Sequence, residues 1–170
     1  MSTVHFVDPA SRLVVTTCTG EVSRIEVETS LTKLRRHPDF KPDFRQLADL
    51  SLVSRLDLHF VDMETIYHGY DPFSNEAKRA VVAPDNGATY GLARMYQSIV
   101  NSAQFEVFQL MLDAITWLGL EATILQAACK RNLSNLKSFQ LREGLVMDLP
   151  PGAPKSFRVL RKPKGKTSGA

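Results

Sequence analysis

The first forty positions change from a strand-like to a helix-like pattern of apolar and polar side chains. Residues 3–7 alternate, a short segment rich in turn-forming residues follows, and residues 13–18 form a β-branched run. This order predicts an antiparallel hairpin. Ser23 can then cap a helix with Glu26 three residues later, and apolar side chains recur at helical spacing until Pro38. The chain is therefore predicted to begin with two strands and a helix.

The pattern of a strand followed by a helix then occurs three more times. Short apolar runs bounded by Pro, Gly or polar residues predict the strands, and a period near 3.6 residues predicts the helices. The predicted pairs are residues 45–50 with 57–68, residues 78–83 with a helix that starts near Asp85, and residues 104–108 with 111–118. Strands that alternate with helices predict an α/β fold, with a mixed, mostly parallel sheet covered by helices.

The chain is expected to have three parts. Residues 1–119 form the α/β domain, residues 120–150 form a helical extension, and residues 151–170 form a basic flexible tail. Within the extension, Glu121 to Arg131 has apolar residues spaced for one helix face, which can pack onto the domain or onto a second subunit. The tail has too little apolar surface to offset the entropy of ordering.

Charge is distributed unevenly along the sequence. Residues 1–120 carry 11 Lys and Arg against 15 Asp and Glu, a net charge of −4, whereas residues 121–170 carry 10 against 3, a net charge of +7. The basic end can attract phosphates of nucleic acid or anionic lipid without specificity. Phe157 is available to stack or insert, but it is the one aromatic residue between Lys155 and Lys166, no nucleic-acid-binding fold is recognised and the main domain is acidic, so we do not expect specific nucleic-acid binding.

Cysteine content and hydropathy indicate a cytoplasmic protein. The two cysteines, Cys18 and Cys129, are far apart in sequence, and no signal-peptide pattern opens the chain. Charged or amide residues interrupt every apolar run before it approaches the roughly 20 residues of a membrane-spanning helix. We therefore expect no transmembrane segment and reduced cysteines, and Cys18 between threonines is interpreted as a packed thiol.

Several segments together resemble the STAS-like bacterial proteins of the SpoIIAA-like kind. They are the opening β-β-α order, Asp49-Leu50, the strand Ala80-Val-Val-Ala-Pro, the helix Tyr90-Gly-Leu-Ala-Arg-Met-Tyr and Asp113-Ala-Ile-Thr-Trp-Leu, within residues 3–118. The resemblance implies a SpoIIAA-like fold and a non-enzymatic protein-interaction or signalling module. Phosphorylation of a Ser in this family's signalling members directs attention to Ser51 and Ser54, although the glycine that follows the switch residue in those members is absent here.

A surface at the carboxyl ends of the central strands is the candidate binding or regulatory site, because ligands of open α/β sheets bind there. We expect a protein partner at this surface and leave self-association as a homodimer open. The candidate residues are Asp49, Ser51, Ser54, Arg55, Asp85, Asn86, Gly87 and Arg94. The structural alternative is that Asp49 bonds a local backbone amide, that Asp85 or Asn86 caps a helix, and that Arg94 forms an ordinary ion pair.

No catalytic residue, metal ligand or cofactor is predicted. The sequence has no Gly-x-Ser-x-Gly elbow and no glycine-rich phosphate loop. His59 and Asp62, and Glu64 and His68, have the spacing of helical metal ligands, but a solvated helix face explains them better.

The alternative function is a carrier of a small apolar or lipid-like ligand between the helices and the sheet. A set of apolar residues would line such a cavity or, in the simpler interpretation, form an ordinary core. The set is Phe6, Val14, Leu47, Val81, Leu92, Phe105, Phe108 and Trp117.

Overall fold

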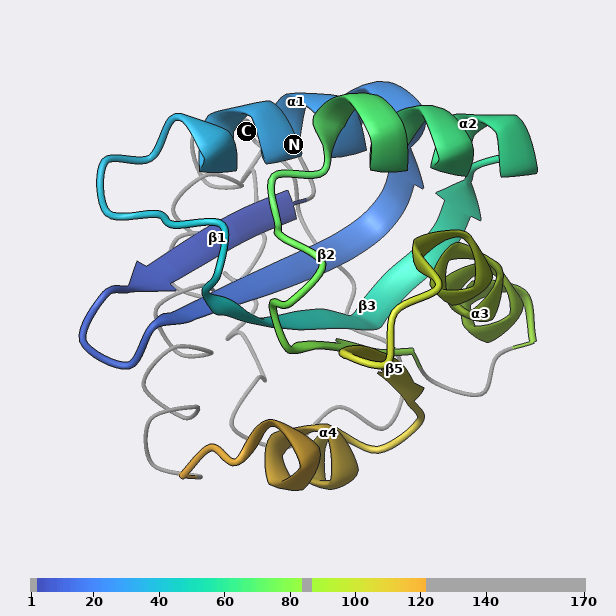
Figure 1. The fold of residues 1–170 in the computed structure, drawn as a ribbon. Helices are drawn as coiled ribbons and strands as arrows, with labels where there is room; N and C mark the ends of the chain where they lie inside the picture. Colours follow the sequence, from blue (N-terminus) through green and yellow to red (C-terminus); the bar gives the residue numbers. More distant parts are fainter. Residues whose placement is uncertain (1–2, 84–86, 122–170) are drawn as a thin grey trace, which may run out of the picture.

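The computed structural model describes residues 3–83 and 87–121, and they form one curved sheet with helices on both faces (Figure 1). The predicted positions Asp85 and Asn86, and nearly all of the predicted extension and tail, lie outside the described residues. The strands are β1 (Thr3–Asp8), β2 (Leu13–Ser23), β3 (Arg45–Asp57), β4 (Arg79–Val82) and β5 (Phe105–Phe108). The helices are α1 (Arg24–Arg35), α2 (Phe60–Thr65) with the π-helical turn η1 (Ile66–Tyr70), α3 (Ala88–Val100) and α4 (Met111–Leu118).

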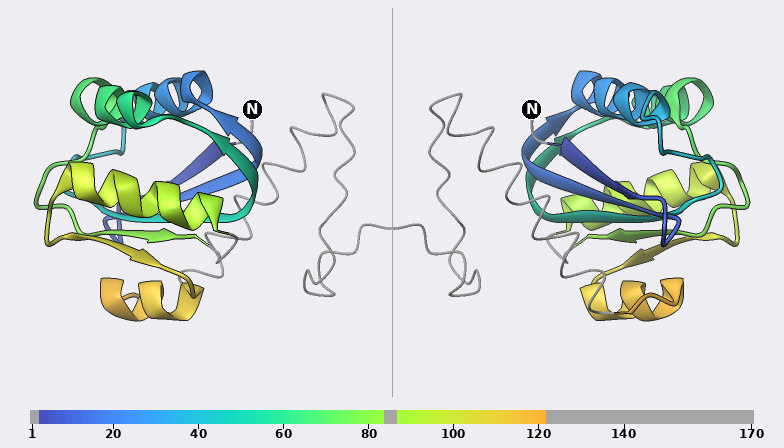
Figure 2. Two further views of the ribbon diagram at one scale, coloured as in Figure 1. Left: turned by 90° about the vertical axis from the view of Figure 1, so that its right-hand side faces the viewer. Right: turned by 90° about the vertical axis from the view of Figure 1, so that its left-hand side faces the viewer.

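The sheet confirms the predicted mixed, mostly parallel α/β fold. Its strand order is β1-β2-β3-β4-β5, with β1 antiparallel to β2 and each later neighbouring pair parallel. Right-handed crossovers between consecutive neighbours place every connecting helix on the same face. Accordingly α1, α2 with η1, and α3 cover one face, while α4 packs on the other (Figure 2).

The two faces have different cores. On the α4 face, Leu47, Ala80 and Val82 pack against buried residues of α4. On the opposite face, Ala48 and Val81 pack against Ala93 and other residues of α3. This alternation follows from the period of two along a strand, which sends successive side chains to opposite faces.

The start of α1 forms as the sequence predicts. Ser23 is the N-cap residue, and the Glu26 carboxylate accepts hydrogen bonds from the Ser23 backbone amide at 2.9 Å and the Ser23 hydroxyl at 3.0 Å. Two orphan amides of the first turn are satisfied in such a capping box. The helix ends at Arg35, before Pro38, as expected.

The predicted strand over residues 45–50 is too short. β3 continues to Asp57, because β2 also continues to Ser23 and pairs with it along this whole length. β4 pairs with β3 only as far as Asp49, so the second half of β3 has β2 as its one strand neighbour among the described residues. Both long strands bend toward α1 and α2 (Figure 1).

The helix predicted over residues 57–68 also differs. Asp57 belongs to β3, and α2 begins only at Phe60, with His59 as its N-cap residue. The His59 backbone amide donates to the Asp62 carboxylate at 2.8 Å, which fixes the helix start. Asp62 and His59 therefore have a capping role.

Candidate ligand-binding cavity

The strand-end residues predicted as a site are spread along the exposed second half of β3. Ser51, Ser54 and Arg55 are exposed and lie within the strand, rather than in a loop or at a helix start. The Asp49 carboxylate accepts a hydrogen bond from the Ser51 backbone amide at 2.9 Å, as in the structural alternative. Arg55 pairs with Asp57 at 3.4 Å, and both side chains are well exposed.

Arg94 and Gly87 lie on α3, separate from these contacts. Arg94 donates to Glu106 of β5 at 3.1 Å and to Gln97 at 2.7 Å, so its ion pair is with Glu106 and not with Asp49. Gly87 is the N-cap residue of α3, with φ of 71°, and its carbonyl accepts from the Gly91 amide at 3.1 Å. Gly87 thus occupies the N-cap position of α3, and Asp85 and Asn86 lie outside the described residues.

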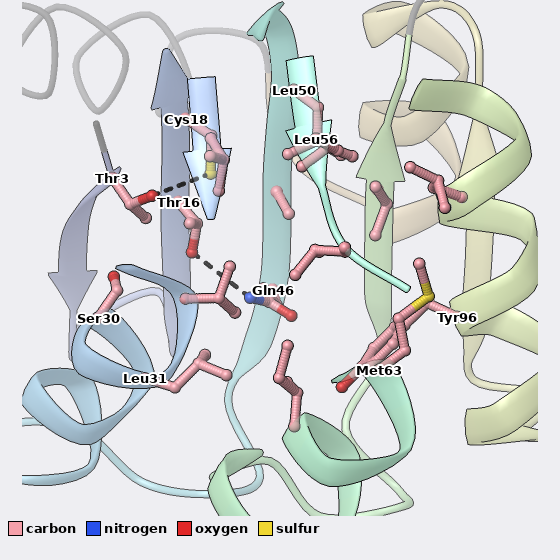
Figure 3. Close-up of a pocket in the computed structure, with 18 of the residues that line it drawn as sticks. Thr3, Thr16, Cys18, Ser30, Leu31, Gln46, Leu50, Leu56, Met63 and Tyr96 are labelled. Atoms are coloured by element: carbon pink, nitrogen blue, oxygen red, sulfur yellow. Dashed lines mark hydrogen bonds between the residues drawn. The ribbon is translucent and has the colours of Figure 1, made fainter. Parts of the chain in front are cut away.

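A cavity of about 160 Å³ lies between the sheet and the three helices on its α1 side. Figure 3 shows its wall side chains converging from β2, β3, α1, α2 and α3. Apolar side chains form most of the wall. They include Cys18, Val22, Val27, Leu31, Ala48, Leu50, Leu56, Leu58, Met63, Ile66, Val81, Leu92, Ala93 and Phe105.

The cavity approaches the surface between the second half of β3 and α3. Leu50 and Leu56 of β3 and Leu92 of α3 line it and are only half-buried. Arg55 and Arg94 are each within two residues of these leucines along the chain. None of the described candidate residues, which are Asp49, Ser51, Ser54, Arg55, Gly87 and Arg94, lines the cavity itself.

A network of polar side chains crosses the sheet beneath the helices. We call it the polar network, and it comprises His5, Thr16, Ser30, Gln46, Asp71, Arg79 and Tyr96. Its strand members come from β1, β2, β3 and β4 in order, and all of its members except Asp71 line the cavity.

The charged end of the polar network is a buried ion pair. Arg79 donates to the Asp71 carboxylate at 2.7 Å, and the side chains are only 7% and 4% exposed. Arg79 also donates to the Gln46 side-chain oxygen at 2.9 Å. Its guanidinium lies over the rings of Phe73, at 4.6 Å, and Phe105, at 5.1 Å. Three kinds of partner thus hold the guanidinium in one place.

The neutral end lies under α1. The Gln46 amide donates to the Thr16 hydroxyl at 3.4 Å, and His5 Nδ1 pairs with the same hydroxyl at 2.9 Å. His5 Nε2 pairs with the Ser30 hydroxyl at 2.6 Å and with the Ser30 carbonyl at 3.2 Å. Both ring nitrogens of His5 are therefore engaged by protein groups.

Burial changes the pKa of three groups around the cavity. Burial lowers the pKa of His5 to about 4, although the hydrogen bond to Ser30 opposes this. Burial raises the pKa of the Cys18 thiol to about 11, and the Thr3 hydroxyl donates to its sulfur at 3.5 Å. Burial, with the Asp71 carboxylate, raises the pKa of Tyr96 well above its usual value. All three groups are therefore neutral at pH 7, and Cys18 is the packed thiol that the sequence predicts.

The polar atoms of the wall satisfy one another. Within residues 3–83 and 87–121, the Ser74 hydroxyl is the one buried side-chain polar atom without a hydrogen-bond partner, and Ser74 does not line the cavity. The cavity therefore offers a bound ligand mainly apolar contacts. This arrangement is suited to holding a molecule by shape and burial.

Sequence reasoning found only part of this site. Of the apolar set proposed for a cavity, Val81, Leu92 and Phe105 do line it. Three others pack on the α4 face of the sheet: Leu47, Phe108 and Trp117. Phe6 packs against Leu13 and Val15 of β2, and Val14 packs against Leu34 of α1. The polar network was missed. Its signal in the sequence is that each of four consecutive strands has a polar residue at a position that faces the cavity. Gln46 of β3 is an example.

The described part of the chain lacks a membrane-spanning helix and a cluster of metal ligands. No helix there has the length and apolar character needed to span a membrane. No group of three or more His, Cys, Asp or Glu residues in these ranges is arranged to hold a metal ion.

Comparison with known proteins finds likeness at the level of structure. No family model and no curated protein matches the chain. Among solved structures, the chain is similar to an uncharacterised protein from the DUF3478 family with a SpoIIAA-like fold, from Shewanella loihica PV-4. The two are 18% identical, the match covers 69% of this chain and 94% of that chain, and the TM-score is 0.46. SpoIIAA-like is also the fold that the sequence resemblance implies.

Proposed function

We propose that this chain is a non-enzymatic binding module that holds a small apolar molecule in the cavity between the sheet and α1, α2 and α3. The observation that supports this is the cavity itself, about 160 Å³ in volume and walled mainly by apolar side chains. Protein interiors are normally close-packed, with few voids larger than a water molecule. The size and the apolar lining of this cavity therefore support a binding site rather than a packing defect.

The energetics favour occupation. Apolar atoms that enter the space displace water from apolar side chains and make van der Waals contacts with the wall. The wall is also preformed, because the polar network and three helices hold it, so binding requires little ordering of the chain.

Filling the cavity from the protein side tests the proposal. Ala93 is buried on α3 and lines the cavity, so Ala93→Leu places three further carbon atoms inside it. We expect this variant to fold and to lose binding of small apolar molecules at least tenfold, measured by ligand-observed NMR and by thermal shift. Ala88→Leu is the matched control, because Ala88 lies on the same helix, is exposed and does not line the cavity.

Mass spectrometry addresses the natural ligand. Native spectra of protein purified without added ligand, followed by organic extraction, should show a stoichiometric small molecule that Ala93→Leu lacks and Ala88→Leu retains. Equal binding by the two variants would remove the cavity as the site.

A second candidate function is protein binding at the surface around Asp49–Arg55 and Arg94. It is favoured by the second half of β3, which has a strand neighbour on one side only among the described residues and carries exposed Ser51, Ser54 and Arg55. An added strand from a partner, or from a second copy, can bind such an edge through backbone hydrogen bonds.

Native mass spectrometry of protein purified from its own host also tests this second candidate. A defined protein partner, a dimer or the mass of a phosphoryl group would support it, and Arg55→Glu with Arg94→Glu should then release the partner. If a partner stays bound to this double variant, the surface is not where it binds.

A further inference from the structure

We infer that the cavity accepts a neutral molecule about the size of one six-membered ring, and that it rejects both long acyl chains and carboxylates of the same ring size. This inference rests on the proposed function and narrows its ligand class. Size, wall chemistry and charge each support it.

Size sets the upper limit. The cavity measures about 160 Å³, close to the roughly 150 Å³ of an engineered apolar cavity that holds one benzene molecule. Pockets for drug-sized ligands have volumes of about 300 to 1,000 Å³. The whole of a long acyl chain therefore does not fit inside the cavity without displacing α1 or α3, whose Leu31 and Ala93 form part of the wall. This excludes the larger members of the lipid-like class that the sequence left open.

Wall chemistry sets the polarity. Leu31, Met63, Val81 and Phe105 line the cavity from α1, α2, β4 and β5. The polar side chains of the wall already bond one another, from Ser30 at one end to the Asp71 pair at the other. A ligand that needs several hydrogen bonds would have to break this network, whereas an apolar ring leaves it intact.

Charge excludes a carboxylate. Arg79 is the cation of the wall, and Asp71 already balances it at 2.7 Å. A second carboxylate beside this pair would leave one negative charge without a counterion in a buried site, which is strongly unfavourable. His5 cannot supply the missing positive charge near neutral pH, because burial keeps its ring neutral. The occupant should therefore be neutral.

Three probes test the inference on the full chain. Toluene is a neutral single ring, benzoate adds a carboxylate to the same ring, and dodecanoate is a long acyl chain. Saturation-transfer NMR and thermal shift should show that toluene binds, that benzoate binds at least tenfold more weakly, and that dodecanoate does not enter the cavity. Binding of toluene should be lost in Ala93→Leu and kept in Ala88→Leu.

A change of cavity size gives an independent readout. Leu31→Ala removes wall atoms and should allow a two-ring molecule, naphthalene, to bind. Leu118→Ala is the control, since Leu118 is also buried but packs on the α4 face. If naphthalene binds the control as well as it binds Leu31→Ala, the size argument fails.

The outcomes separate the inference from the proposed function. Binding of dodecanoate or benzoate that Ala93→Leu abolishes would overturn the neutral single-ring class and leave the binding function standing. Absence of binding by all three probes, or toluene binding that Ala93→Leu leaves unchanged, would overturn both.

Discussion

At the scale of single residues, His5 couples the polar network to pH. Its pKa is lowered to about 4 in the folded chain, against about 6.5 when the ring is exposed, because burial disfavours the charged form. Between these values the unfolded chain binds more protons than the folded one, so stability falls as the pH falls from 6.5 toward 4. We expect a loss of up to about 3 kcal/mol over this range, from about 1.4 kcal/mol per pKa unit.

Urea unfolding at several pH values measures this effect. His5→Gln keeps a polar side chain beside Thr16 and Ser30 but has no group that titrates in this range. The variant can be less stable at every pH, so the comparison is of slopes. A variant profile as steep as that of the original chain between pH 6.5 and 4 would assign the loss to other groups.

Asp71 determines whether the cavity can bind a negatively charged ligand, because its carboxylate balances the charge of Arg79. Asp71→Asn keeps the shape of the side chain and can still accept from Arg79 and Tyr96, but it removes the charge that balances Arg79. We expect lower stability, since breaking a buried pair leaves an uncompensated cation. We also expect benzoate to stabilise this variant more than toluene does, which reverses the order for the original chain. Thermal midpoints with each compound measure the reversal, and an unchanged order would contradict the charge argument.

At the scale of elements, two glycines, one at the N-cap of α3 and one inside the helix, have opposite roles. Gly87 caps the helix with φ of 71°, whereas Gly91 lies inside the helix, and a Cβ at either position would meet no atom within 4 Å. Gly87→Ala should destabilise by about 1 kcal/mol, because its backbone lies in a region that L residues avoid. Gly91→Ala should stabilise by about 0.5 to 1 kcal/mol through higher helix propensity. Thermal unfolding of each variant measures these changes in stability. If both substitutions change stability in the same direction, the positive φ of Gly87 does not determine the effect of its substitution.

Some elements could be predicted from sequence pattern and others could not. The α1 cap was predictable because Ser23 and Glu26 form a local signal within one turn. The length of β3 was not, because residues after Leu50 are held by pairing with β2, which lies more than twenty residues earlier in the sequence. For the same reason, the polar network becomes visible only when the sheet places Gln46 and Arg79 opposite each other. Features set by residues within one helical turn could be predicted from the sequence, whereas contacts that depend on the register between strands could not.

At the scale of the whole molecule, the cavity exists because α1, α2 and α3 lie on one face of the sheet and α4 lies on the other. The sequential strand order places α1, α2 and α3 on one face, toward which β2 and β3 bend (Figure 1), and the cavity lies between that face and these helices. The polar network lies across that face and joins four strands. Because the same elements that form the fold also form the wall, occupation of the cavity should stabilise the entire domain.

Global stabilisation gives a concentration-dependent prediction. A ligand that binds only the folded state adds about 2.7 kcal/mol at a concentration one hundred times its dissociation constant. For a domain of this size, that corresponds to a rise of several degrees in the thermal midpoint. Calorimetry with increasing toluene should show this rise in the original chain and in Ala88→Leu. A midpoint in Ala93→Leu that rises equally would place toluene elsewhere.

Cys18 provides a reporter inside the wall. It lines the cavity, is 7% exposed and has a pKa raised to about 11 by burial. In a Cys129→Ser variant it is the sole cysteine of the chain, which has two. At pH 8, its reaction with the small neutral reagent methyl methanethiosulfonate should be at least roughly tenfold slower than in urea, because little thiolate is present and access is restricted. Saturating toluene should slow the reaction of the folded protein further, since the reagent and the ring compete for one space, and benzoate at the same concentration should not. A labelling rate that toluene leaves unchanged would mean that the ring and the thiol do not share the cavity.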